Sequence, residues 1–136
     1  MLNFSWLNPH REIGLLLLRA SVGVIMMLHG WPKLAGGEAI WVKVGAAMQY
    51  LGIGFWPAFW GFLAAVAETL GGFLLVIGFL TRPAALALTG TMVVATMTAW
   101  HTSGGEYRIW AHPAVVGLVC LSIFIVGAGR YSVDRN

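Results

Sequence analysis

Apolar residues gather into four long stretches along the chain, separated by shorter segments that hold most of the polar and turn-forming residues. These stretches predict four helices, which cover residues 13–31, 57–80, 84–101 and 110–129. A helix needs roughly 20 predominantly apolar residues to cross the hydrocarbon core of a bilayer, and each stretch has about that length. The pattern therefore predicts an all-α protein, an integral membrane four-helix bundle.

The connection between the first and second spans contains a weaker pattern of its own. Trp41, Val44, Met48 and Leu51 recur at helical spacing, and glycines follow at positions 52 and 54. A short amphipathic helix lying in the membrane interface has this pattern, with glycine at its end. An ordinary packed loop is the alternative.

The composition agrees with a protein that lives in lipid. Of its 136 residues, 59% are apolar and 10% are charged, whereas a soluble domain has about a quarter charged residues. Four spans and short connections use nearly the whole length, which predicts a single transmembrane domain over residues 1–136 with the lipid bilayer as its surroundings. The basic residues are scattered singly, so nucleic-acid binding has no support. The single cysteine, Cys120, excludes a dithiol centre within this chain.

The basic residues also bear on orientation. Four spans place both termini on one side, and cytoplasmic loops of membrane proteins carry an excess of Lys and Arg. The side of the termini holds Arg11, Arg82, Arg130 and Arg135, against Lys33, Lys43 and Arg108 on the other. This bias favours a multi-pass membrane protein with both termini in the cytoplasm.

Two charged residues lie within the predicted spans, Arg19 in the first and Glu68 in the second. A charge at the bilayer centre costs roughly 2.5–3.5 kcal/mol on insertion scales, so neither side chain should face lipid. Helical spacing puts small residues beside each charge. One face of the first span carries Arg19, Gly23, Met26 and Gly30, and one face of the second carries Gly61, Ala65, Glu68 and Gly72. Such faces let two backbones approach closely.

We therefore predict a buried ion pair between Arg19 and Glu68, formed across the antiparallel first and second spans. One interpretation is that the pair only fixes the register of the two helices. The other is that these residues, with His29, form a polar pocket that binds a quinone head group or relays a proton. The sequence does not separate the two.

Three histidines lie at span ends on the side opposite the termini, together with two charged residues of the last connection. A polar cluster is expected at this mouth of the bundle, made of His29, His101, Glu106, Arg108 and His112. Two histidines from different helices could hold a haem, as in membrane cytochromes. Because nothing in their spacing selects a pair, we expect neither haem nor a metal site here.

Several short motifs occur in a recognisable order along nearly the full length. They are Arg19, His29-Gly30 and Lys33-Leu34 in the first span; Glu68 with Gly71-Gly72, and Gly78-Phe79-Leu80-Thr81-Arg82, in the second; and Gly129-Arg130-Tyr131-Ser132-Val133-Asp134 at the end. In this order the chain resembles the DoxX family of small four-helix membrane proteins. The resemblance implies association with redox complexes of the bacterial cytoplasmic membrane, such as thiosulfate:quinone oxidoreductase.

Two functions remain open. The first is an accessory or quinone-interacting subunit of a membrane oxidoreductase complex, which predicts a cavity open to lipid beside Arg19 and Glu68. The alternative is a non-catalytic scaffold or assembly partner, with a tightly closed pair and no cavity; a small-solute carrier would need a water-filled route. The sequence contains no complete set of cofactor ligands or catalytic residues, so quinone is the one cofactor considered, and the isolated chain is not expected to be an enzyme. A protein partner or a homo-oligomer in the membrane is expected.

Overall fold

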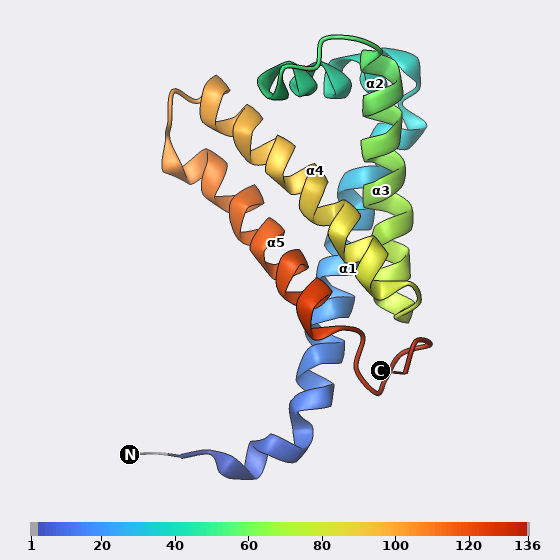
Figure 1. Ribbon diagram of the computed structural model, residues 1–136, viewed down its shortest axis with the longest axis vertical. Helices are drawn as coiled ribbons and strands as arrows, with labels where there is room; N and C mark the ends of the chain where they lie inside the picture. The colour runs from blue at the N-terminus through green and yellow to red at the C-terminus, as the bar shows by residue number, and fades with distance from the viewer. Residues whose placement is uncertain (1–2, 136) are drawn as a thin grey trace.

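A computed structural model describes residues 3–135 as a set of helices. Four of them are long and apolar enough to cross a membrane. A shorter helix and two 3₁₀ segments complete the described chain (Figure 1). In order, the elements are η1 (Ser5–His10), α1 (Arg11–Ala35), α2 (Glu38–Gly45), η2 (Ala46–Leu51), α3 (Pro57–Ile77), α4 (Thr81–Thr102) and α5 (Tyr107–Val126).

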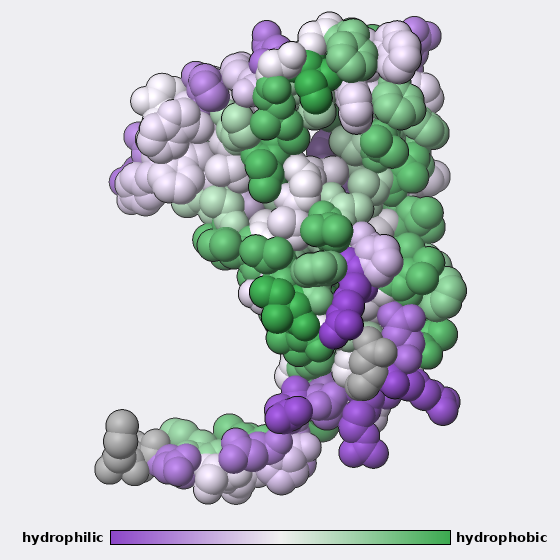
Figure 2. Space-filling view, in the orientation of Figure 1, coloured by the Kyte–Doolittle hydropathy of each residue, from purple (hydrophilic) through white to green (hydrophobic). Residues whose placement is uncertain are grey.

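The fold confirms the predicted all-α architecture with four candidate spans. The short helix α2 lies between the first and second spans, where the sequence predicted one. The 3₁₀ segment η2 follows it directly. Large apolar side chains cover much of the outside (Figure 2), and at most 33% of any span is buried within the chain. The lipid bilayer therefore surrounds most of the apolar surface.

Helix ends differ from the prediction by a few residues. The second span was predicted to run to Leu80, but α3 ends at Ile77 because Gly78 takes up a left-handed conformation with φ +70°. That conformation suits glycine, which has no Cβ to clash. The next helix then begins at Thr81, three residues before the predicted start of the third span.

The four spans form a curved layer rather than a closed square. Helix α1 packs on α3, α3 on α4, and α4 on α5, whereas α1 and α5 touch only slightly. The α4–α5 turn lies at one end of the molecule, and the two termini lie at the other (Figure 1). The weak packing between α1 and α5 leaves one side of the bundle open.

Close packing of α1 against α3 depends on the small residues that the sequence placed on facing sides. The buried residues of α1 are Arg19, Gly23, Met26 and Gly30, which is the predicted face. Gly23 and Gly72 meet so closely that a Cβ on either would overlap the backbone oxygen of the other. This contact sets the register of the two helices.

Candidate functional site

The two buried charges lie at different heights in the bundle. The contact between Gly23 and Gly72 and the contact of Gly30 with Glu68 and Thr69 fix the register. Glu68 therefore lies at the height of Gly30. Gly30 is eleven residues after Arg19 on the same helix, or about 16 Å at 1.5 Å per residue.

The predicted ion pair between Arg19 and Glu68 is accordingly wrong. Helical side chains point back towards the N-terminus of their own helix, so the Arg19 guanidinium extends away from Glu68, towards the end of the bundle that holds the termini. There it donates a hydrogen bond to the carbonyl oxygen of Tyr131. Both charges are nevertheless buried, with 0% of Arg19 and 3% of Glu68 exposed, so neither faces lipid.

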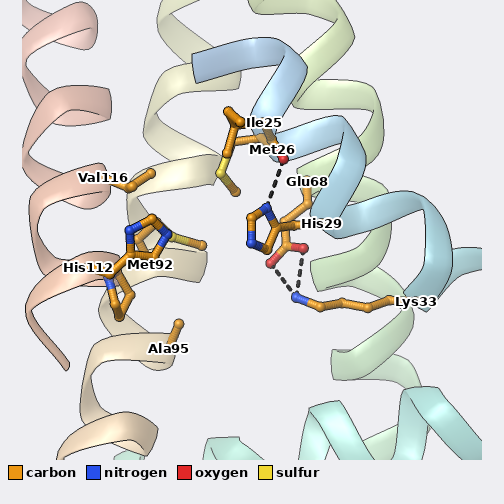
Figure 3. A pocket seen from close by; sticks show the side chains of 10 residues that line it. Ile25, Met26, His29, Lys33, Glu68, Met92, Ala95, His112 and Val116 are labelled. Atoms are coloured by element: carbon orange, nitrogen blue, oxygen red, sulfur yellow. Dashed lines mark hydrogen bonds and ion pairs between the residues drawn. The ribbon is translucent and has the colours of Figure 1, made fainter. Parts of the chain in front are cut away.

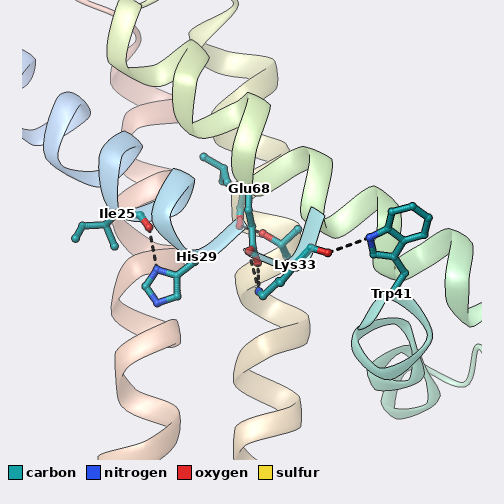
Figure 4. Close-up of polar contacts among 7 residues, drawn as sticks. Ile25, His29, Lys33, Trp41 and Glu68 are labelled. Carbon is teal, nitrogen blue, oxygen red and sulfur yellow. Dashed lines mark hydrogen bonds and ion pairs between the residues drawn. The ribbon is translucent and has the colours of Figure 1, made fainter. Parts of the chain in front are cut away.

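Glu68 pairs instead with Lys33, near the end of α1. The Lys33 Nζ atom lies 2.7 Å from one carboxylate oxygen of Glu68 and 2.9 Å from the other. Lys33 continues the buried face of α1 three residues after Gly30, and its side chain reaches back towards Glu68 (Figure 4). The lysine backbone is held in turn, because the Trp41 indole N–H of α2 donates to its carbonyl oxygen at 3.0 Å.

Sequence reasoning missed Lys33 as a site residue although the signal was present. Arg19, Gly23, Met26, Gly30 and Lys33 follow one another at spacings of four, three, four and three, which is a single helical stripe. A candidate partner for Glu68 could therefore have been found on the predicted face.

A cavity of about 190 Å³ lies beside the pair of Lys33 and Glu68. Side chains from α1, α3, α4 and α5 surround it (Figure 3). Its lining residues are Ile25, Met26, His29, Lys33, Glu68, Met92, Ala95, His112, Pro113 and Val116. Glu68, Lys33 and His29 lie together on one side of it, His112 lies on the α5 side beside Met92 (Figure 3), and the remaining lining residues are apolar.

Two histidines stand at the α1–α5 side of this cavity, and both are exposed. The ring centroids of His29 and His112 are 6.3 Å apart. The Nδ1 atom of His29 donates to the carbonyl oxygen of Ile25 at 2.8 Å, because a carbonyl oxygen only accepts. In the neutral ring, Nε2 of His29 is therefore left as a hydrogen-bond acceptor.

The other members of the predicted polar cluster lie apart from this cavity. His101 stacks on Tyr50 of η2, with ring centroids 4.4 Å apart. The Glu106 carboxylate accepts from the backbone N–H of Arg108, which caps the start of α5. Of the five predicted residues, only His29 and His112 line this cavity. The α4–α5 turn, near which the other three lie, is away from α1 (Figure 1).

Arg19 occupies a second polar region, which contains the last described residues. The C-terminal strap, residues 130–134, folds back across the α3–α4 turn. Its Asp134 carboxylate accepts from the backbone N–H groups of Leu80 at 3.0 Å and Thr81 at 2.8 Å. Leu80 is the N-cap of α4 and has no side-chain acceptor, so Asp134 supplies the cap from a distant part of the chain.

This second region is tightly packed around the guanidinium of Arg19. The hydrogen bond from the backbone of Thr81 is the main cause that lowers the pKa of Asp134, and the nearby positive charge of Arg19 contributes. A Cβ at Gly78 would overlap the Arg19 guanidinium. Within residues 3–135, the Nε and Nη1 atoms of Arg19 have no hydrogen-bond acceptor. The guanidinium is enclosed by protein.

Comparison with known proteins places the chain among membrane proteins. The DoxX family model matches residues 14–101. The chain is 33% identical over 105 residues to "Putative oxidoreductase CatD" of Bacillus subtilis, covering 74% of this chain and 73% of that protein.

Two further relatives come from Escherichia coli. Inner membrane protein YphA is 29% identical over 137 residues, covering 93% of this chain and 91% of its own. Inner membrane protein YqjF is 27% identical over 127 residues, covering 91% and 92%. No solved structure matches the chain. With four candidate spans, these relatives indicate a multi-pass protein of the inner membrane. The chain belongs to the DoxX family.

Proposed function

We propose that this protein is an accessory membrane subunit that binds the head group of a quinone for an oxidoreductase complex. The observation that carries the proposal is the cavity beside the ion pair of the buried Glu68 and the partly exposed Lys33, on the open side of the bundle between α1 and α5. The relative that bears the name "Putative oxidoreductase CatD" supports a redox setting.

The lining of the cavity suits a small ring that carries oxygen atoms. A quinone carbonyl is a hydrogen-bond acceptor, and the Lys33 ammonium group is a donor with three hydrogens. A quinol hydroxyl group is a donor, and the Glu68 carboxylate or Nε2 of His29 can accept from it. The apolar walls, formed by Met26, Met92 and their neighbours, provide contact for the faces of the ring.

The position of the cavity suits a ligand that arrives from lipid. Since α1 and α5 touch only slightly, the mouth between them is not closed by helix packing. His29 and His112 line the cavity and are exposed at this mouth. A hydrophobic molecule dissolved in the bilayer could therefore enter sideways, without crossing the interface.

Lys33, Glu68 and His29 would handle protons rather than electrons. Quinone reduction to quinol takes up two electrons and two protons, and acid–base groups beside the ring oxygens can deliver the protons. The electrons would come from a redox cofactor of a partner subunit. For this reason we propose an accessory role, with a protein partner or a second copy in the membrane. From the distribution of Lys and Arg we also propose that both termini lie in the cytoplasm.

A scaffold without a ligand site is the weaker proposal. It was expected to have a tightly closed pair of charges and no cavity. Lys33 and Glu68 do form a pair, but a cavity lies beside them. A purely structural role predicts a closed polar region, and the region around Arg19 is closed. That region is separate from the cavity beside Glu68.

The test is photolabelling of the protein in lipid nanodiscs with a ubiquinone analogue that carries an azido group on its ring. We expect labelled peptides within residues 25–33 and 112–116, with labelling suppressed by excess unlabelled ubiquinone. Glu68→Gln should reduce this labelling about tenfold, because it removes a charged acceptor that contributes roughly 1.5–3 kcal/mol.

Glu38→Gln is the matched control, since Glu38 is exposed in the first turn of α2 and lies outside the cavity. It should label as the parent protein does. Labelling spread evenly over the lipid-facing surface, or an unchanged pattern in Glu68→Gln, would remove the head-group assignment.

A further inference from the structure

A second cavity adjoins the first one on the outer side of α4 and α5. Its volume is about 360 Å³, larger than that of the cavity beside Glu68. Met92 and Pro113 line both cavities, so the two are neighbours that share a wall. We call this second cavity the α4–α5 groove; its lining residues are Thr89, Met92, Val93, Thr96, Met97, Pro113, Ala114, Gly117, Leu118 and Leu121.

The groove is apolar although two threonines line it. The hydroxyl of Thr89 donates to the carbonyl oxygen of Ala85 at 2.8 Å, and that of Thr96 donates to Met92 at 2.7 Å. Because both hydroxyl hydrogens are used within α4, these residues have no free donor for a ligand. The groove thus offers apolar contact and no charged group, in contrast to the cavity beside Glu68.

From this arrangement we infer that the α4–α5 groove holds the hydrophobic tail of the quinone whose head group occupies the cavity beside Lys33 and Glu68. The inference rests on the proposed function. A ligand with a ring that carries oxygen atoms and with one apolar chain matches a cavity that has polar groups among its apolar walls and lies next to an apolar groove. The smaller cavity lies below the usual range of small-molecule sites, about 300–1,000 Å³, whereas the volumes of the two neighbouring cavities together fall within it.

The chemistry of the first cavity disfavours a phospholipid as the occupant. A phosphate group near the cavity would add a second negative charge beside Glu68, and the two would have to share the single positive charge of Lys33, which lies 2.7 and 2.9 Å from the carboxylate oxygens. A neutral ring carries no such penalty, since like charges in a low dielectric repel strongly. A phospholipid also has two chains, whereas the groove is lined by residues of α4 and α5 alone.

In a bilayer, the groove can favour a quinone tail over lipid chains by its shape and not by its hydrophobicity. Lipid chains are as apolar as leucine side chains, so moving a tail from lipid to the groove gains packing but no burial from water. The inference is therefore tested by where the tail lies, and affinity is a secondary readout.

The experiment uses a ubiquinone analogue with a diazirine on its tail, photolysed with the protein in nanodiscs. We expect label within residues 89–97 and 113–121, suppressed by excess unlabelled long-tailed ubiquinone. Ala114→Phe places a large side chain at a position that lines the groove and not the first cavity. It should lower tail labelling about tenfold, because the phenyl ring takes up space that the tail would occupy, and leave ring labelling within a factor of about two.

Ala87→Phe is the matched control, because Ala87 is exposed on α4 and lines neither cavity. It should change neither label. If Ala114→Phe proves unfolded in detergent, Leu118→Ala replaces it, with Leu70→Ala as control. Leu118 is 63% exposed and lines the groove, whereas Leu70 is 52% exposed on α3 and lines neither cavity.

Three results would overturn the inference. Tail labelling could scatter over the lipid-facing surface, it could resist competition, or crosslinks could show a second copy of the chain seated in the groove. Specific ring labelling in any of these cases would leave the proposed function standing. Absence of specific ring labelling would remove the function and the inference together.

Discussion

The two buried charges, Arg19 and Glu68, are equally hidden from the surroundings but lie in opposite kinds of environment. Arg19 is enclosed by the α3–α4 turn and the C-terminal strap, and its contacts are backbone groups and a carboxylate farther away. Glu68 borders a cavity together with its partner Lys33. Burial of a charge in a membrane protein therefore does not identify a ligand site. Space beside the charge distinguishes Glu68 from Arg19, and it is the reason why we propose a ligand site at Glu68 alone.

Because the two environments differ, substitutions near Arg19 and substitutions near Glu68 should have different effects. Variants near Arg19 should alter stability and leave ring labelling unchanged. Variants near Glu68 should alter labelling, with a stability cost that depends on which partner is removed. Four predictions test this division, in order of decreasing effect.

The largest effect is expected from Lys33→Met, which leaves the Glu68 carboxylate buried without its partner. Breaking a buried pair costs about 3–5 kcal/mol. The Lys33 side chain is 31% exposed, so solvent screening lowers the expected loss to about 2–3 kcal/mol. Reversible unfolding in mixed detergent measures it.

Two further variants interpret that result. Lys43→Met, at an exposed position of α2, should change stability little. The double variant Lys33→Met/Glu68→Met should recover most of the loss, since replacing both members of a pair by apolar groups is often neutral. A single variant as stable as the parent would mean that the pair contributes nothing to folding.

Gly78→Ala should lower the free energy of unfolding by about 2 kcal/mol. A left-handed conformation costs a non-glycine residue roughly 1–2 kcal/mol, and the guanidinium of Arg19 must move to make room for the Cβ. Gly90→Ala is the control: nothing lies within 4 Å of its Cβ position, and alanine favours a helix by up to about 1 kcal/mol. Thermal unfolding in detergent compares the two. Equal behaviour would show that the packing around Arg19 is loose.

Asp134→Ala removes the acceptor that caps α4 and should cost about 1 kcal/mol, the usual loss for an N-cap. Val133→Ala, at a neighbouring residue that is 61% exposed, should cost less. Chemical denaturation in detergent is the measurement, and ring photolabelling should stay at the level of the parent protein. Loss of ring labelling in Asp134→Ala would contradict the separation of the two regions.

The smallest effect is a dependence of stability on pH. Since the folded-state pKa of Asp134 is lowered, its carboxylate stabilises the fold fully above the unfolded pKa of about 3.9. This stabilisation is lost as pH falls through the folded value. Asp134→Ala should therefore show a shallower decline of the unfolding midpoint below about pH 5. Identical slopes in the two proteins would assign the acid sensitivity to other carboxylates.

The helices and their contact faces could be predicted from the sequence because both follow from periodicity. The apolar stretches gave the spans, and the spacing of Gly23, Gly30 and Gly72 gave the faces on which α1 and α3 meet. Helical spacing also marked the segment that becomes α2. These features depend on residue type and position along one helix, which a sequence displays directly.

The ion pair could not be predicted in the same way because it depends on register and side-chain direction. Arg19 and Glu68 have opposite charges on facing helices, but their side chains diverge, and Lys33 extends back to Glu68 instead. The cap from Asp134 on α4 joins residues 53 apart. Such a contact leaves no trace in local pattern.

The C-terminal strap has a consequence for biogenesis. Tyr131, whose carbonyl accepts from Arg19, is separated from it by 112 residues, so the ribosome makes the arginine long before its acceptor exists. During synthesis, the first span must enter the bilayer with its guanidinium unmatched. The strap can dock only after α5 has been threaded across. Docking of the strap at this end of the molecule is thus the last step of membrane insertion, and it takes place only after every span has crossed.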